Sequence, residues 1–184
     1  MHSPLPALLL TLPLASYAHA AEQVQGQGGR ILHYSSTQTR SDLDHEEQNR
    51  YRNHRDHQFN GASLAAVLQA AQSALHQHGY GQIEAEPDYH VIRALRHEQL
   101  VSRGRQVLRG ILKLKLPMPG KPDHQSTELL LMLRPGSQPQ QVLARARLET
   151  TVWDSNGNSH TKLDSDPDDY RQLYGHIDAA LRGR

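Results

Sequence analysis

The chain has 184 residues, and its 20 lysines and arginines nearly balance its 19 aspartates and glutamates, which gives a formal net charge of +1. Such a small charge provides no general field that would attract nucleic acid or an anionic membrane. Hydrophobic residues make up 36% of the chain, with one Phe and one Trp, so we expect one domain with a modest, aliphatic core. The absence of cysteine excludes a disulfide framework and lipid attachment at a cysteine of this sequence.

Residues 1–20 have the pattern of a secretory signal peptide. An apolar run over residues 5–15 is followed by Ala18-His19-Ala20, a small-x-small cleavage signal, although no lysine or arginine precedes the run. The run is shorter than the roughly 20 apolar residues that cross a bilayer as a helix. We therefore predict cleavage after Ala20, a periplasmic or secreted protein, and no transmembrane segment in the mature form. The alternative is an apolar tail from a wrongly assigned gene start.

Residues 21–58 are predicted to be a polar, flexible leader and loop that contains at most one short strand. Residues 21–29 are rich in Gly and Gln, as flexible linkers are. The short strand would be Arg30–Ser36. Residues 37–58 offer almost no apolar side chains to bury, so this stretch is interpreted as a long loop or a solvated helix.

The next stretch has the apolar periodicity of an amphipathic helix. Leu64, Val67, Leu68, Ala71 and Leu75 recur at spacings of three and four, which predicts a helix over about residues 61–78. Ser63 or Asn60 would cap its start, and Gly79 stands where a left-handed residue would end it. Pro87 blocks any continuation, and residues 89–95 are then predicted to form a strand.

The rest of the chain predicts an antiparallel sheet and a closing helix. Alternating or apolar runs predict strands over residues 107–116, 127–134, 142–153 and 160–163. Asp154-Ser155-Asn156-Gly157 is a hairpin turn signal. Asp166 and Pro167 begin a helix with an apolar stripe that reaches the C-terminus.

Two amphipathic helices need a shared apolar surface, and a mostly antiparallel sheet supplies it. We therefore predict an α+β fold, a two-layer sandwich in which both helices cover one face of the sheet and the other face is solvated. Residues 59–184 would form this single domain, after the signal peptide and the leader.

Short motifs in this domain resemble a family of exported bacterial envelope proteins. Gln77-His78-Gly79-Tyr80, then Pro87-Asp88-Tyr89-His90-Val91, and later Val152-Trp153-Asp154 before a terminal helix, are similar to the domain-of-unknown-function family numbered 4136. More loosely, they look like the LptE accessory fold and the TolB N-terminal domain. The resemblance covers about residues 60–184 and implies an envelope role. It carries over no functional residue, and this chain lacks the lipidated cysteine that is common in the family.

Basic residues recur on the outward positions of two predicted strands. Lys113 and Lys115 lie on one, and Arg145 and Arg147 on the other. If the strands are neighbours, the four residues form a basic binding surface on the open side of the sheet, which Arg93 would join for some strand orders. Such a surface would hold an anionic envelope polymer or the carboxylates of an envelope protein. Charge that merely keeps a sheet face soluble is the alternative.

The histidine-rich segment offers a weaker, second site. His45, His54 and His57, with nearby carboxylates, would ligate zinc or copper if His54 and His57 shared a helix face. His76 and His78 form a second close pair. With 13 histidines in the chain, close pairs also arise by chance, so a solvated polar loop is the alternative.

The sequence holds no recognisable catalytic motif. Gly-x-Ser-x-Gly, a phosphate-cradling glycine loop and His-Glu-x-x-His are all missing. We therefore predict an exported binding or accessory protein of the bacterial cell envelope that is not an enzyme and needs no cofactor. The alternatives are a periplasmic zinc- or copper-binding protein and a hydrolase whose site the sequence does not reveal.

Overall fold

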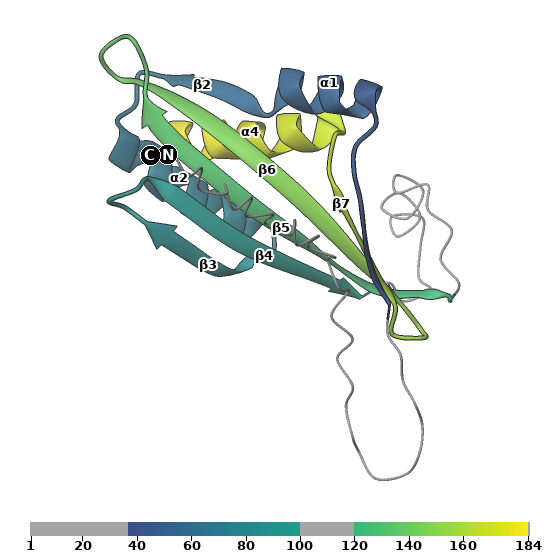
Figure 1. Cartoon of the computed structure of the whole chain (residues 1–184). Coiled ribbons are helices and arrows are strands. Elements are labelled where there is room, and N and C mark those ends of the chain that lie inside the picture. Colours follow the sequence, from purple (N-terminus) through teal and green to yellow (C-terminus); the bar gives the residue numbers. More distant parts are fainter. Residues whose placement is uncertain (1–36, 100–119, 184) are drawn as a thin grey trace, which may run out of the picture. The chain divides into compact units, whose positions relative to one another are not determined.

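The computed structural model describes residues 37–99 and 120–183, and in these residues the predicted α+β fold is confirmed (Figure 1). The strands are β1 (Gln38–Ser41), β2 (Asp56–Asn60), β3 (Gly81–Glu86), β4 (Val91–Gln99), β5 (Pro122–Pro135), β6 (Gln141–Asp154) and β7 (Ser159–Leu163). The helices are α1 (His45–His54), α2 (Leu64–Gln77) and α4 (Pro167–Arg182). The described residues therefore contain three helices where the sequence predicted two.

All the described strands belong to one mixed sheet. Its order is β1-β7-β6-β5-β4-β3, and β2 also pairs with β6. Every pairing is antiparallel except that of β1 with β7. One edge of β6 is shared, because β2 pairs with its first residues and β7 with its last. Strands β5 and β6 are each 14 residues long and form the centre of the sheet.

The polar stretch 37–58 is ordered, so its interpretation as a long loop was wrong. It contains β1, α1 and the start of β2, and only the alternative of a solvated helix holds, for residues 45–54. The side chain of Asp44 accepts a hydrogen bond from the Glu47 N–H, and Glu47 reciprocates, which is a capping box. Glu47 also forms an ion pair with Lys162 of β7 at 2.6 Å, and both side chains are largely buried. Local capping and this distant ion pair hold a helix that has no buried apolar residue of its own.

The predicted helix over residues 61–78 is confirmed as α2. Ser63 caps it by accepting from the Ala66 N–H, and Gly79 follows it with φ of +81°. Glycine reaches this left-handed conformation without strain, which explains the sharp end of the helix. Strand β3, which the sequence analysis did not predict, follows at once and forms one edge of the sheet. The pairing of β3 with β4 is interrupted between Gly81 and Glu84, where Gln82 has φ of +45°.

The closing helix is also confirmed, as α4, with Asp166 as its cap and Pro167 in its first turn. Figure 1 shows α2 and α4 side by side against one face of the sheet. The apolar residues of both helices share one core with the inward residues of the strands. The largest fully buried side chains are Tyr170, Phe59, Leu75, Ile92, Leu129, Leu131 and Ile177. The modest aliphatic core expected from composition thus includes four aromatic side chains, since Tyr80 and Tyr174 are buried as well.

The predicted hairpin turn after β6 is confirmed. The buried carboxylate of Asp154 accepts hydrogen bonds from the backbone N–H groups of Asn156, Asn158 and Gly120. Although burial alone would raise the pKa of Asp154, the hydrogen bond from the Asn158 side-chain amide and those from the backbone lower it below its usual value. Gly157 supplies the positive φ, +81°, that closes the turn.

Several predictions concern parts of the chain outside the described residues. They are the signal peptide at residues 1–20, the leader and the Arg30–Ser36 strand, and the strand over residues 107–116 with Lys113 and Lys115. Within residues 37–99 and 120–183, no helix combines the length and the apolar character that crossing a membrane requires.

Candidate functional site

The sheet face that α2 and α4 leave uncovered is called the open face below. Side chains alternate along β6: Val142, Ala144, Ala146 and Leu148 are buried toward the helices, as the sequence predicted. The intervening Arg145 and Arg147 are exposed on the open face. Of the four residues of the predicted basic surface, these two are therefore placed together, two positions apart on one strand.

The arginines of the open face are bound to carboxylates. Arg145 donates two hydrogen bonds to Asp56 of β2, at 2.6 and 2.9 Å, and this contact lowers the pKa of the Asp56 carboxyl. Arg147 donates from Nε to Glu149 at 3.0 Å, and Arg40 of β1 pairs with the same carboxylate. The residues that contact Arg145 and Arg147, together with Arg40, come from β1, β2 and β6. All of these ion pairs lie on the open face.

A further ion pair lies on the same face, toward the edge of the sheet that β3 forms. Arg93 of β4 donates to Glu128 of β5 at 2.7 Å, and its register partner on β3 is Glu84. The described part of the open face is thus charged but largely neutralised. This differs from the uncompensated basic surface that the sequence suggested.

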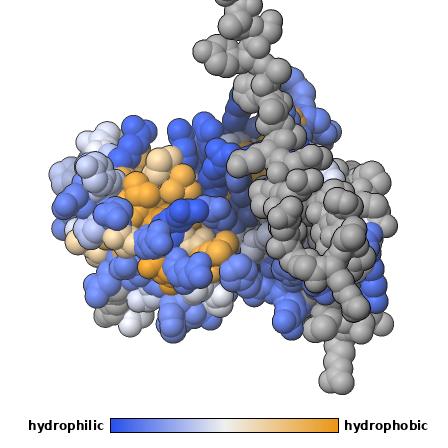
Figure 2. All heavy atoms as spheres, turned by 60° about the horizontal axis from the view of Figure 1, so that its bottom comes forward, coloured by the Kyte–Doolittle hydropathy of each residue, from blue (hydrophilic) through white to orange (hydrophobic). Residues whose placement is uncertain are grey.

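Apolar side chains also lie on the open face, which the sequence did not predict. Register and alternation place five of them there, in a diagonal stripe over β4, β5 and β6: Val91, Leu95, Leu130, Met132 and Leu143. Met132 is 42% exposed, and Val91 is its direct neighbour across the strands. We call these five residues the apolar stripe. Figure 2 shows how apolar residues gather among charged ones on part of the molecular surface.

The three histidines of the predicted metal site lie apart. His45 and His54 stand at opposite ends of α1, roughly 13 Å apart along the axis at about 1.5 Å per residue. His57 is on β2, so it does not share a helix face with His54 as the spacing suggested. Its ring stacks on that of Tyr174 at 4.6 Å, and its Nε2 lies 3.4 Å from a carboxylate oxygen of Asp178. Among the described residues, no three His, Asp or Glu side chains are grouped to hold a metal ion.

The second histidine pair is divided as well. His76 is exposed near the end of α2, while His78 stacks face to face on His176 of α4, with 3.3 Å between the ring centres. Burial, and then the neighbouring His78, lower the pKa of His176 below its usual value. The stacked rings therefore connect the end of α2 to α4. Protonation of His176 should weaken this contact.

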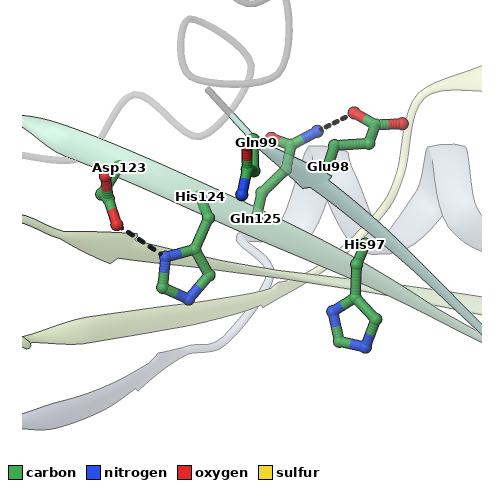
Figure 3. Close-up of a pocket in the computed structure, with 6 residues that line it drawn as sticks. All are labelled: His97, Glu98, Gln99, Asp123, His124 and Gln125. Atoms are coloured by element: carbon green, nitrogen blue, oxygen red, sulfur yellow. Dashed lines mark hydrogen bonds and ion pairs between the residues drawn. The ribbon is translucent and has the colours of Figure 1, made fainter. Parts of the chain in front are cut away.

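A pocket of about 430 Å³ lies where β4 ends and β5 begins (Figure 3). Its described lining is His97, Glu98, Gln99, Asp123, His124 and Gln125. The ring of His124 stacks on Trp153 at 4.7 Å and lies 3.0 Å from a carboxylate oxygen of Asp123. The side chain of Gln125 donates to Glu98 at 2.6 Å, and its buried Oε1 has no hydrogen-bond partner among the described residues. The residues that line the pocket are polar or charged, and in part they already bind one another.

The hydroxyl of Thr39 contacts the imidazole of His160, a pairing that a nucleophilic hydrolase would use. Thr39 Oγ1 lies 2.7 Å from Nδ1 of His160, but the buried Nε2 of that ring has no partner. A nucleophile–histidine–acid relay requires an acid on the second nitrogen, and the described residues provide none there. In the described part of the chain, this pair links β1 to β7.

Comparison of the chain with models of known protein families gives no match, and no curated protein matches it. The resemblance to the family numbered 4136 therefore stays a prediction that rests on the short motifs quoted above.

Proposed function

We propose that the chain is an exported, non-catalytic binding protein of the bacterial cell envelope, an accessory or assembly factor whose binding surface is the open face. The proposal includes cleavage after Ala20, residence in the periplasm, and a two-layer sandwich with its helices on one side of the sheet. The export signal at residues 5–20 and the uncovered sheet face are the features that support it.

The mixture of side chains on the open face is the observation that carries the proposal. Apolar side chains within a rim of charges are typical of interaction sites. Met132 is the exposed member of the apolar stripe, and the other four residues are half-buried. The pocket beside His124 is less suited to this role, because its lining is polar and part of its charge is already bound within the chain.

The chemistry of the face favours a protein partner over an anionic polymer. A polymer of phosphates or carboxylates is held by free cations. Arg93, Arg145 and Arg147 instead contact Glu128, Asp56 and Glu149. A partner that contributes apolar contacts gains more from this face than one that contributes negative charge.

In-cell crosslinking tests the proposal. A photoreactive amino acid at Met132 should give crosslinked products, and the same group at Gln172, exposed on α4, serves as the matched control. Mass spectrometry of the processed chain gives its N-terminus, and cell fractionation gives its compartment. A chain that begins near Ala21, is found in the periplasm and crosslinks through position 132 supports the proposal. An unprocessed cytoplasmic chain, or equal crosslinking from both positions, contradicts it.

A further inference from the structure

The open face is compatible with a copy of itself, and we propose that two copies of this chain pack open face to open face. This inference rests on the proposed function, because it uses the same surface and names a second copy as its partner. In such a dimer, each apolar stripe crosses the other about a two-fold axis. The contact is then isologous, with the same residues on both sides.

The charges of the face permit this contact. Within the described strands, register and alternation place five arginines and five carboxylates on the open face. They are Arg40, Arg93, Arg134, Arg145, Arg147 and Asp56, Glu84, Glu86, Glu128, Glu149. A face with one sign of charge repels its own copy, whereas a balanced face does not. The ion pairs that Arg40, Arg93, Arg145 and Arg147 already make also reduce the cost of burying these charges in a dimer.

The apolar stripe supplies the attraction. Leu130 lies between Arg93 and Arg147 in the register, and Met132 lies between Val91 and Arg145. The aliphatic stems of these arginines extend the apolar surface beside the stripe while their charged ends stay on their carboxylates. Sheets that pack face to face bury such side chains in a layer about 10 Å thick.

The area of the face is sufficient for a stable dimer. Strand β4 has nine residues, which gives a length of about 30 Å at about 3.3 Å per residue. The face is five strands wide, since β2 and β7 together occupy the position beside β6, and this gives about 24 Å at about 4.8 Å per strand. The product, about 700 Å² per copy, is close to the roughly 800 Å² per partner of a standard specific interface.

The chain contains no cysteine, so a single introduced cysteine reports contacts between copies directly. Cysteine is placed in turn at each position of the apolar stripe, and at Ser73 of α2 and Gln172 of α4 as controls away from it. Both control residues are exposed on the helices. Under mild oxidation of the processed chain, at least one stripe position near the two-fold axis should form a disulfide-linked dimer, because such a bond needs Cα atoms within about 7 Å. The two control positions should remain unlinked.

Sedimentation equilibrium provides the second readout. The unaltered processed chain should sediment with twice the mass of one chain. The double variant Leu130→Glu, Met132→Glu should sediment with the mass of one chain, because its new negative charges would lie opposite their own copies across the two-fold axis. Ser73→Glu with Gln172→Glu adds the same charge on the helices and should leave the dimer intact. Circular dichroism verifies that both variants remain folded.

The outcomes separate the two proposals. An unaltered chain that sediments as a monomer up to its solubility limit overturns self-association. If position 132 then still crosslinks to a different envelope protein, the proposed function stands without the dimer. If position 132 crosslinks to nothing, both proposals fail.

Discussion

The hydroxyl of Tyr170 accepts a hydrogen bond from the backbone N–H of Leu148, at 3.4 Å, and donates one to the carbonyl of Asp164 at 2.9 Å. Leu148 lies where the edge of β6 passes from its pairing with β2 to its pairing with β7. Tyr174, one turn further along α4, similarly donates to the carbonyl of Arg55. Two buried tyrosines of one helix thus satisfy backbone groups at the break between two strands.

Tyr170→Phe should therefore destabilise the fold without changing its packing volume. The substitution leaves a buried N–H without its partner, a loss of about 1–3 kcal/mol. Urea unfolding, followed by the fluorescence of the single Trp153, measures it. Tyr89→Phe removes an exposed hydroxyl and should change nothing. A loss for Tyr170→Phe that is no larger than for Tyr89→Phe would show that the hydroxyl is not needed.

The ion pair between Glu47 and Lys162 should couple α1 to the sheet. Their side chains are 15% and 12% exposed, so either single substitution, Glu47→Gln or Lys162→Met, leaves a mostly buried charge unpaired. We expect each to cost about 2 kcal/mol or more, toward the roughly 3–5 kcal/mol for a fully buried pair. The double variant should recover much of that loss. The exposed pair Glu46–Arg50 is the matched control and should contribute less than about 1 kcal/mol.

Stability should fall as the solution becomes acidic below about pH 6.5, the ordinary pKa of histidine. Burial and the stacked ring of His78 lower the pKa of His176 in the folded state. The unfolded chain therefore binds a proton that the folded chain does not, and stability present above the unfolded pKa is lost as pH falls. His160, whose pKa is lowered by burial and by Lys162, contributes in the same direction.

Urea midpoints at pH 7.5 and pH 5.5 measure this dependence. His176→Gln should reduce the difference between the two midpoints, and the part due to His160 should persist. His54→Gln, which changes a histidine at the end of α1, is the control and should leave the difference as it is. A His176→Gln variant with an unchanged pH dependence would contradict the assignment to the stacked pair.

Zinc binding, if it occurs, should not involve His45 together with His54. The backbone positions of His45 and His54 are roughly 13 Å apart along α1. Zinc holds each ligand nitrogen at about 2 Å, so one ion cannot bind both side chains. Titration calorimetry of the unaltered chain and of His45→Ala should therefore give the same zinc affinity. A marked loss of affinity in His45→Ala would require α1 to rearrange.

Sequence patterns predicted the elements that bury a clear apolar face. Helices α2 and α4 have long apolar stripes with recognisable caps, and β6 alternates over its whole length. The segment 37–58 was misjudged because its order does not come from burial of its own apolar residues. Phe59 is the buried side chain of β2, and the strand is held by backbone pairing with residues more than 80 positions away.

The candidate site was harder to predict for a similar reason. The exposure of Arg145 followed from local alternation, but its partner Asp56 lies 89 residues earlier in the chain. Ion pairs of this kind depend on strand order, so the outward positions of the basic residues on their own strands suggested a basic surface without its carboxylates. Leu130 and Met132 belong to the continuous apolar run 129–133, in which no polar residue marks which side faces outward.

The shared edge of β6 also determines when the fold can be completed. The earliest described strands, β1 and β2, pair with β7 and β6, so residues 38–60 must wait for residues 141–163 to be synthesised. The hairpin of β5 and β6 closes a short loop, whereas these pairings close loops of about a hundred residues, which slows folding. The first two described strands can therefore join the sheet only after the last third of the chain has begun to emerge, whereas α2 and the β3–β4 pairing involve no residue beyond Gln99.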